Sequence, residues 1–445
     1  MPRTHRFSIL AILLVLCFAF AAVSTGEPES STTLAAGDGL QWYKGNLHTH
    51  SHWSDGDDYL EMIALWYKER DYDFLCFTDH NVLANTERWV EVDKTKGGRT
   101  AYDKLKARFP DWIEEREGEG GLEVRLRTFA EVSEKIAEPG KYLLIQGEEI
   151  SDRFDSHPIH LNASNIQEVI PPIGGDSVLE TMQNNVNAVI AQRERTGQPI
   201  LVHLNHPNFG YAITAEELMR VVGENFFEVY NGHPSVHNSG DHVHASTERI
   251  WDVILTWRIT ELDLPLMYGL AVDDGHEYHN IPSRASEPGR GWVVVLAEEL
   301  TPDALIDSLE AGRFYASSGV DLKRVSSSPT GLKVEVDAEE GVEYTIDFIG
   351  TRRGFDSTSE EKTDDDGNPI RTTRSYSDDV GELLQSTTAT SAEYHFTGDE
   401  LYVRARITST REHPNPAEPG EFERAWSQPI LGPAANRNPK KPTSP

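Results

Sequence analysis

The feature that most constrains the fold is an alternation of short apolar runs and amphipathic segments, which continues from about residue 42 to residue 314. This alternation is typical of βα units, in which each strand is followed by a helix that covers the sheet. The predicted strands are 45–48, 72–78, 142–150, 159–162, 200–204, 226–230, 268–272 and 292–296. We therefore predict an α/β fold, and a barrel is the arrangement that fits best.

Most of these predicted strands end in residues whose side chains can bind metal ions. Barrel enzymes assemble their sites from the carboxyl ends of several strands, so these side chains are expected to meet. The residues at the strand ends are His48, His50, Asp79, His80, Glu148, Glu149, His160, His206, Asp273, Asp274 and His276. Their recurrence predicts one shared metal site.

The motif His48-Thr49-His50 is weak evidence when it is taken alone. Side chains two apart on a strand share a face, so the two imidazoles can reach one ion. Seventeen histidines in 445 residues would nevertheless give roughly 0.6 such pairs by chance. His242-Val243-His244 is a second example in this chain. The motif gains its weight from the residues that follow it in order.

Six motifs together resemble the PHP (polymerase and histidinol phosphatase) family over about residues 43–320. The match is in both the order of the motifs and their places after predicted strands. The motifs are Gly45-Asn46-Leu47-His48-Thr49-His50, Ser54-Asp55-Gly56, Thr78-Asp79-His80, Gly147-Glu148-Glu149-Ile150, His206-Pro207 and Asp274-Gly275-His276. Segments 288–292 and 312–316 are similar to the carbaryl-hydrolase-like branch. The resemblance implies a distorted (β/α)7-type TIM-like barrel, the PHP fold.

The resemblance also implies three groups of metal ligands. The first group is His48, His50, Glu149 and Asp274; in the second, Glu149 bridges to an ion held by His160 and His206; the third is Asp55, His80 and His276. Glu148 and His157 are the alternatives to Glu149 and His160. Mixed imidazole and carboxylate donors suit manganese, zinc or iron better than calcium. We expect two or three divalent ions per chain.

The implied chemistry is hydrolysis by a hydroxide held between metal ions, with Glu149 as the bridging carboxylate. Three divalent ions against the carboxylates of Asp55, Glu149 and Asp274 would leave a local charge of about +3, which favours an anionic transition state. A small phosphomonoester fits this charge most naturally. Hydrolysis of a carbamate, amide or ester is the first alternative, and a non-catalytic secreted protein that binds metal or carbohydrate is the second.

Other side chains have a structural interpretation beside a functional one. Arg284 and Arg290 follow the last motif and could bind a substrate anion, or they could be solvated loop arginines. Glu228, with Tyr230 and Asn231, could line the pocket or belong to a turn. Two further expectations are that Asp79 bonds a ligand histidine and that Cys76 packs in the core. Of the remaining histidines, His279 has the best placement to face the site.

The sequence divides into four parts. Residues 1–25 read as a signal peptide, which predicts a secreted or periplasmic protein without a stable membrane anchor after cleavage. A catalytic domain follows at 42–322, with an inserted cap or lid at 85–140. Alternating apolar residues at 326–432 predict a small β-sandwich, and 433–445 is expected to be disordered.

The charge of the chain limits its partners. The formal net charge is −32 at pH 7. Nucleic-acid binders present basic patches that neutralise phosphates, so nucleic acid is not expected as a partner.

Overall fold

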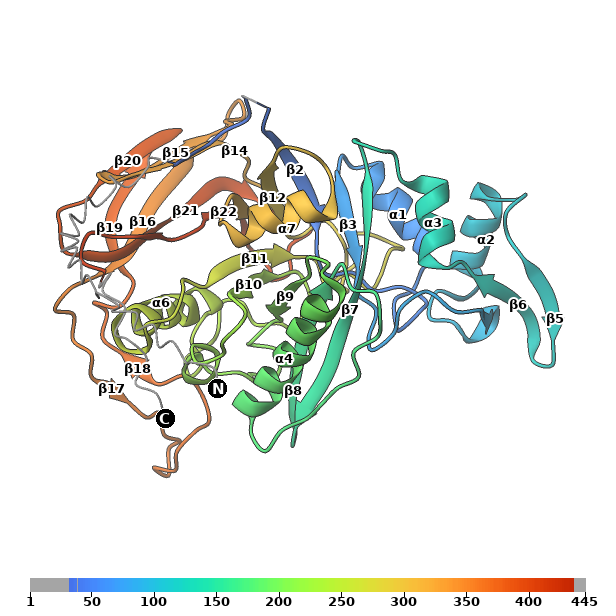
Figure 1. Cartoon of the computed structure of the whole chain (residues 1–445), viewed down its shortest axis with the longest axis horizontal. Helices are drawn as coiled ribbons and strands as arrows, with labels where there is room; N and C mark the ends of the chain where they lie inside the picture. The colour runs from blue at the N-terminus through green and yellow to red at the C-terminus, as the bar shows by residue number, and fades with distance from the viewer. Residues whose placement is uncertain (1–31, 38, 436–445) are drawn as a thin grey trace, which may run out of the picture.

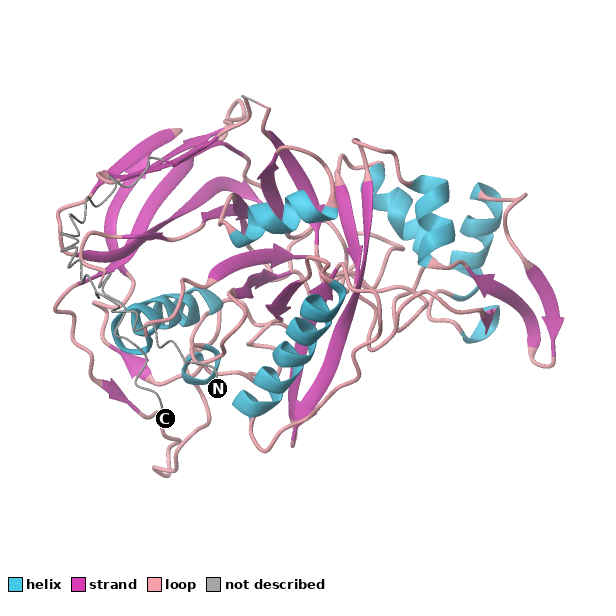
Figure 2. Cartoon of the chain, viewed as in Figure 1, coloured by secondary structure: helices cyan, strands magenta, loops and turns pink. Residues whose placement is uncertain are grey.

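The computed structural model describes residues 32–37 and 39–435. The predicted signal peptide and most of the predicted disordered tail lie outside these residues. Helices and strands alternate in the first two thirds of the chain, and strands dominate the rest (Figure 2). Among the described residues, none of the helices combines the length and the apolar character that crossing a membrane would need.

The first part of the chain contains all the helices found in residues 32–37 and 39–435. Its strands are β1 (Thr32–Leu34), β2 (Gln41–Asn46), β3 (Phe74–Phe77), β4 (Arg88–Glu91), β5 (Glu115–Gly118), β6 (Gly121–Leu126), β7 (Leu143–Phe154), β8 (His157–Ser164), β9 (Leu201–Leu204), β10 (Phe226–Asn231), β11 (Tyr268–Val272), β12 (Trp292–Ala297) and β13 (Phe314–Ser317). Its helices are α1 (Leu60–Lys68), α2 (Gly98–Arg108), α3 (Phe129–Ile136), α4 (Val178–Thr196), α5 (Ala215–Leu218), α6 (Thr247–Trp257) and α7 (Pro302–Glu310), with a 3-10 turn η1 (Val92–Lys94) and a π-helical turn η2 (Arg258–Leu262).

The second part contains only strands. They are β14 (Leu322–Ser328), β15 (Gly331–Val336), β16 (Tyr344–Arg352), β17 (Ser359–Glu360), β18 (Ser375–Tyr376), β19 (Glu382–Thr388), β20 (Ser391–His395), β21 (Glu400–Glu412), β22 (Phe422–Ser427) and β23 (Ile430–Leu431).

The main sheet runs in the order β11-β10-β9-β8-β7-β3-β2-β12 and then continues into the C-terminal strands. Each of the eight predicted strands overlaps one of these, so the mixed α/β character is confirmed. The strands β2, β3 and β7 are parallel to one another, as are β9, β10 and β11. β8 is antiparallel to both of its neighbours, so it separates the two parallel groups.

The predicted closed barrel is not confirmed by the strand pairing. The sheet curls so far that β2, β3, β7 and β9–β12 all contribute to one apolar core. However, β12 runs antiparallel along β2 and occupies the edge that β11 would need. In the described chain only an isolated bridge between Thr49 and Gly275 joins the two ends, with the His50 amide donating to the Gly275 carbonyl at 3.0 Å. The sheet is therefore a curled one whose rim is held by this bridge.

Helix α4 covers the outer face of β7, β8 and β9 (Figure 1). It begins where the Ser177 side chain accepts a hydrogen bond from the Glu180 amide, and it ends at Gly197 in the left-handed conformation, φ 68°. These are the caps that helix ends favour. Its buried side chains, Met182 and Val186 among them, pack against Ile150 and Ile159 of the sheet. The face of these strands that α4 does not cover is the one on which the residues at the strand ends can meet.

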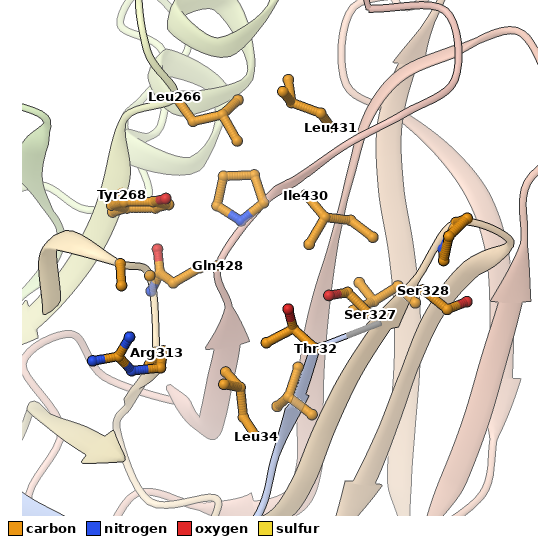
Figure 3. A pocket seen from close by; sticks show the side chains of 16 residues that line it. Thr32, Leu34, Leu266, Tyr268, Arg313, Ser327, Ser328, Gln428, Ile430 and Leu431 are labelled. Atoms are coloured by element: carbon orange, nitrogen blue, oxygen red, sulfur yellow. The ribbon is translucent and has the colours of Figure 1, made fainter. Parts of the chain in front are cut away.

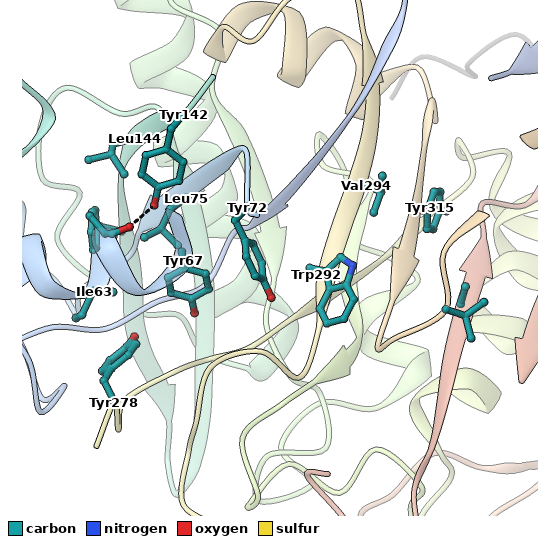
Figure 4. Close-up of a cluster of buried hydrophobic side chains, with 14 of the residues drawn as sticks. Ile63, Tyr67, Tyr72, Leu75, Tyr142, Leu144, Tyr278, Trp292, Val294 and Tyr315 are labelled. Carbon is teal, nitrogen blue, oxygen red and sulfur yellow. Dashed lines mark hydrogen bonds between the residues drawn. The ribbon is translucent and has the colours of Figure 1, made fainter. Parts of the chain in front are cut away.

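A second group of buried side chains fixes α1 against β3 and β7 (Figure 4). It is rich in tyrosines, and the Tyr142 hydroxyl donates to the Ala64 carbonyl at 2.7 Å. Buried tyrosines need such partners because an unpaired hydroxyl costs free energy. The cluster places the loop between β2 and α1, which carries Asp55.

Residues 85–140 form a small unit beside the main sheet. It consists of the three-stranded sheet β4-β6-β5 with α2 and α3, and it projects from one end of the molecule (Figure 1). Three contacts of this kind join it to the loop before α1: Lys104 pairs with Asp58 at 2.5 Å, the Trp53 indole donates to the Arg127 carbonyl at 3.2 Å, and the Arg88 guanidinium donates to the Trp53 carbonyl at 2.5 Å. Its predicted role as a lid remains a prediction.

The C-terminal strands form two sheets that share apolar side chains. One sheet has the order β1-β14-β15-β20, and the other continues the main sheet through β22, β21, β16 and β19. Leu332, Val334, Ile346 and Val403 belong to the core between them. A cavity of about 440 Å³ lies between these strands and the start of β11. Figure 3 shows its mixed lining, which includes Leu34, Arg313 and Ile430 but none of the histidines at the strand ends.

Candidate metal centre

All nine residues proposed as ligands come together at one rim of the curled sheet. Each lies at or just beyond a strand end, or in the long hairpin β7–β8. His48 and His50 follow β2, Asp55 lies in the next loop, His80 follows β3, Glu149 lies in β7, His160 in β8, His206 follows β9, and Asp274 and His276 follow β11. The strand-end argument therefore predicted the proximity of eight of them, whereas Asp55 was included only because of the family resemblance.

Glu149 is at the centre of the cluster. Its Oε1 lies 3.0 Å from His160 Nδ1 and 3.5 Å from both His48 Nε2 and His206 Nε2. Its Oε2 lies 2.7 Å from His80 Nδ1 and 3.3 Å from His50 Nε2. The side chain is 1% exposed. Burial alone would raise the pKa of Glu149, but the surrounding histidines hold it well below its usual range. The carboxylate thus joins five imidazoles.

Three of the four compact donor groups among the described residues are built from these nine residues alone, and the fourth is His48 with His203 and Glu228. The three are His48 with His50 and Glu149; Glu149 with His160 and His206; and His50 with Asp55, His80 and His276. Asp274 Oδ1 lies 3.3 Å from Nε2 of both His48 and His50, beside the first group. Asp55 is the exposed member, with 57% of its side chain accessible. These groups match the three ligand sets implied by the resemblance, with His50 shared between two.

The orientation of the donor atoms fits divalent ions better than hydrogen bonds. His160 Nδ1 and Glu149 Oε2 are buried and make no hydrogen bond of good geometry with described residues, although both lie close to other donors. His48 Nε2 and His50 Nε2 face each other at 3.1 Å. Imidazole nitrogens and carboxylate oxygens aimed at common points are the donor set of zinc, manganese and iron sites. The residues present therefore fit a metal centre.

Glu228 is the most important residue that the sequence left undecided. Its Oε1 lies 2.7 Å from His48 Nδ1 and 3.2 Å from His203 Nε2, and its Oε2 accepts the His206 amide at 2.8 Å. Burial would raise the pKa of Glu228, but His48 and the other histidines keep it below its usual range. By bonding Nδ1, Glu228 turns Nε2 of His48 toward Glu149. The only sequence signal for this role was an acidic residue inside a predicted strand.

Glu228→Gln is expected to weaken metal binding without removing a ligand. The amide cannot hold His48 and His203 as the carboxylate does, and such supporting partners are typically worth about 10- to 100-fold in metal affinity. Competition with a chelator, monitored in wild type and variant, measures the affinity. A circular dichroism spectrum unlike that of wild type would mean that the fold, and not the orientation of His48, had changed. Unchanged affinity would contradict the assigned role.

Asp79 has a role different from the predicted one. Its carboxylate accepts hydrogen bonds from the Ser51 amide at 2.8 Å, the Ser51 hydroxyl at 2.7 Å and the Ser54 hydroxyl at 2.6 Å. It therefore ties down the loop that carries Asp55 and does not bond a ligand histidine. Asn205 acts on the other side of the cluster, where its amide donates to Glu149 Oε1 at 2.8 Å.

The alternatives to the chosen ligands lie outside the cluster. Glu148 faces the opposite side of β7, where its Oε2 accepts the Ile170 amide, and burial raises the pKa of Glu148 to about 7. His157 is near the Phe154 carbonyl at the hairpin end. His279 was the other histidine considered for the site. Its Nε2 bonds the Asp57 carbonyl at 3.1 Å, and it does not join the nine clustered residues. Cys76 is buried, and burial raises the pKa of its thiol to about 12.

The prediction that Arg290 binds a substrate anion is wrong. A guanidinium has five N–H donors, and all of those in Arg290 are used by the protein. Nε donates to the Asn415 carbonyl, Nη1 to the carbonyls of Gly232 and Ala285, and Nη2 to Glu287 and the Asn415 side chain. The side chain is fully buried. Arg284, the other candidate, is exposed in a left-handed turn, φ 72°, and does not join the nine clustered residues.

The rim beside the cluster is aromatic. The ring of Phe209, half-buried after β9, lies 5.1 Å from that of His206 and 6.2 Å from that of His160. On its other side, His233 stands 5.9 Å away, and His233 also lies 5.6 Å from His276. His233 is half-buried at the edge of the site.

Comparison with known proteins gives remote similarities only. No family model and no curated protein matches the chain. Among solved structures, it is similar to a two-domain protein from Bacteroides vulgatus described as containing a predicted PHP-like metal-dependent phosphoesterase, with 15% identity, TM-score 0.38, and coverage of 88% of this chain and 96% of that one. PsfC from Pseudomonas syringae gives 15% identity, TM-score 0.30, and coverage of 60% and 88%. A protein from Bifidobacterium adolescentis proposed as a metal-dependent phosphoesterase gives 14% identity and a TM-score of 0.29, with coverage of 60% of this chain and 95% of that one.

Proposed function

We propose that this protein is a metal-dependent hydrolase of the PHP type that cleaves small phosphomonoesters. The observation that carries the proposal is the convergence of nine histidine and carboxylate side chains into three overlapping groups around Glu149. Six of these residues are at least nine-tenths buried, including His48, His50 and Glu149, so the site is built and is not a chance surface cluster. Sites with several perturbed titratable groups at one rim are typical of catalysis.

The role of the protein side chains follows from their positions. Divalent ions bound here would supply an activated water and neutralise the charge of a phosphoryl group. Glu149 joins the three groups, while Glu228 and Asn205 fix the orientation of His48 and Glu149. Phe209 and His233 shield one side of the rim. Asp55, exposed and within 3.5 Å of His80 and His276, marks the open side.

Several further assignments belong to the same proposal. The sequence motifs at 288–292 and 312–316 favour the carbaryl-hydrolase-like branch of the PHP family. The apolar segment near the start of the sequence favours export, with a small molecule as substrate and no stable membrane anchor after cleavage. Catalysis is assigned to residues 42–322, with manganese, zinc or iron as the ions, and the strands at 326–432 form an accessory domain.

The test combines metal analysis with a substrate panel. Purified wild type is expected to hold two or three divalent ions per chain and to hydrolyse phosphomonoesters faster than phosphodiesters, carbamates, amides or aryl esters. His206→Ala should lower kcat/KM by about 100-fold or more, because one donor to the central group is lost. His157→Ala, a histidine of the β7–β8 hairpin outside the cluster, serves as the control.

The outcomes separate the alternatives. Less than one bound ion per chain would refute the metal centre. Equal rates in wild type and His206→Ala would refute the site. Faster turnover of carbamates or esters would replace the phosphomonoester assignment, and bound metal without any turnover would favour a binding protein.

A further inference from the structure

The hairpin β7–β8 extends beyond the main sheet, and the strand face that carries Glu149 continues along it. Successive residues of a strand point to opposite faces, and Ile150 and Phe154 of β7 pack toward α4. Asp152 points the same way, where its carboxylate accepts the Gly174 amide and the Asn185 side chain, both at 2.8 Å. The pairing with β8 has no bulge up to Phe154–His157. Odd-numbered residues of this hairpin strand therefore face the metal site.

Arg153 is the third residue on that face, after Glu149 and Ser151. The Ser151 hydroxyl contacts His80 Nδ1 at 2.5 Å, which places Ser151 beside the ligands. Arg153 stands two residues further, about 6.8 Å along the strand, and pairs across the hairpin with Pro158. Its side chain is exposed and takes part in no ion pair within the described chain. Among the described residues, Arg153 is therefore a cationic side chain without an ion-pair partner, and it lies just beyond the cluster of candidate ligands.

A cavity lined by Arg153 reaches one of the candidate metal ligands, His160. It has a volume of about 480 Å³, and hairpin residues line it: Ser151, Asp152, Arg153, Asp155, Ser156, Pro158 and His160. The loop after β9 borders it, since a Cβ placed on Gly210 would lie 3.9 Å from Pro158. The neighbouring Phe209 provides an apolar surface beside His160 and His206. Arg153 and Phe209 thus both lie near His160, on the outer side of the cluster.

We propose that Arg153 is a specificity-determining residue that binds an oxyanion carried by the leaving group of the substrate. The inference rests on the proposed function, because it places the scissile group at the cluster. A planar guanidinium pairs with a carboxylate or phosphate through two parallel hydrogen bonds. The ring of Phe209, beside His160, offers an apolar surface for a flat stem of the substrate. The preferred substrate class is a phosphomonoester whose leaving group bears a second anion.

The experiment uses two phosphonates that the protein cannot hydrolyse, phenylphosphonate and 4-phosphonobenzoate, which differ only in the distal carboxylate. Titration calorimetry on the manganese-loaded full chain measures both Kd values. Wild type should bind 4-phosphonobenzoate about 10- to 100-fold more tightly, as expected for a charged hydrogen-bonded pair. Arg153→Ala should lose this preference while its Kd for phenylphosphonate changes less than about twofold. Arg153→Lys should keep part of it.

The controls isolate the role of the guanidinium. Arg195→Ala removes an exposed arginine in the last turn of α4. The chain passes from this turn to the start of β9, so Arg195 lies at the opposite end of the strands from the site. This variant should leave the preference intact, and all variants should hold the same metal content. An equal preference in wild type and Arg153→Ala, or none in wild type, would overturn the proposal. Because binding is read without turnover, failure of wild type to hydrolyse phenyl phosphate would count only against the phosphoesterase assignment.

Discussion

Glu149→Gln is expected to lower kcat/KM by about a thousandfold or more and to reduce the bound metal by at least one ion per chain. The carboxylate contacts five histidines through its two oxygens, at 2.7–3.5 Å. An amide keeps the size of the side chain but removes the negative charge and one acceptor. The two donor groups that contain Glu149 would then lose their common member, and His50 and His80 of the third group would lose the charge of its Oε2. Elemental analysis and steady-state kinetics on the same preparation measure both effects.

Glu148→Gln is the matched control, because the two glutamates are adjacent, buried and on opposite faces of β7. Glu148 Oε2 accepts the Ile170 amide at 2.8 Å and touches none of the metal ligands. Its substitution should leave the metal content and kcat/KM within about twofold of wild type, as for a residue outside the reacting groups. If Glu148→Gln had the larger effect, the assignment of Glu149 as the bridging residue would be wrong.

The sequence predicted which residues lie together better than it predicted the sheet around them. His48, Glu149 and Asp274 could be found because parallel strands bring their carboxyl ends to one rim, whatever the exact pairing. The closure of the sheet depends on which edge β12 occupies, and this is decided by packing between residues far apart in sequence. For the same reason the sequence did not reveal that β8 runs antiparallel to β7 and β9.

The residues that support the ligands were harder to predict than the ligands. Glu228 and His203 lie inside predicted strands, where a polar side chain is read either as a pocket residue or as a turn neighbour. Only the contacts of Glu228 with His48 and His203 separate these interpretations. Arg290 shows the opposite error, because a sequence does not tell a buried arginine from an exposed one. Arg153 was overlooked because it follows its motif by several residues and matches no ligand pattern.

The buried network around Arg290 is expected to contribute strongly to the stability of the fold. Arg290 pairs with Glu287 at 3.0 Å, and both side chains are fully buried. Glu287 Oε1 also accepts the amide and hydroxyl of Ser283, both at 2.6 Å. Because Arg290 reaches Gly232, Ala285 and Asn415 as well, it connects three loops from different parts of the chain. Removing one member of such a buried pair leaves the other charge without compensation.

Arg290→Met is therefore expected to lower the free energy of unfolding by about 3–5 kcal/mol, whereas Arg284→Ala, which removes an exposed side chain, should change it by less than about 0.5 kcal/mol. Urea unfolding followed by tryptophan fluorescence compares the variants under one condition. The double variant Arg290→Met, Glu287→Leu should recover part of the loss, since it removes the unpaired carboxylate but not the three carbonyls left without donors. A raised KM with unchanged stability in Arg290→Met would instead restore Arg290 as a substrate-binding residue.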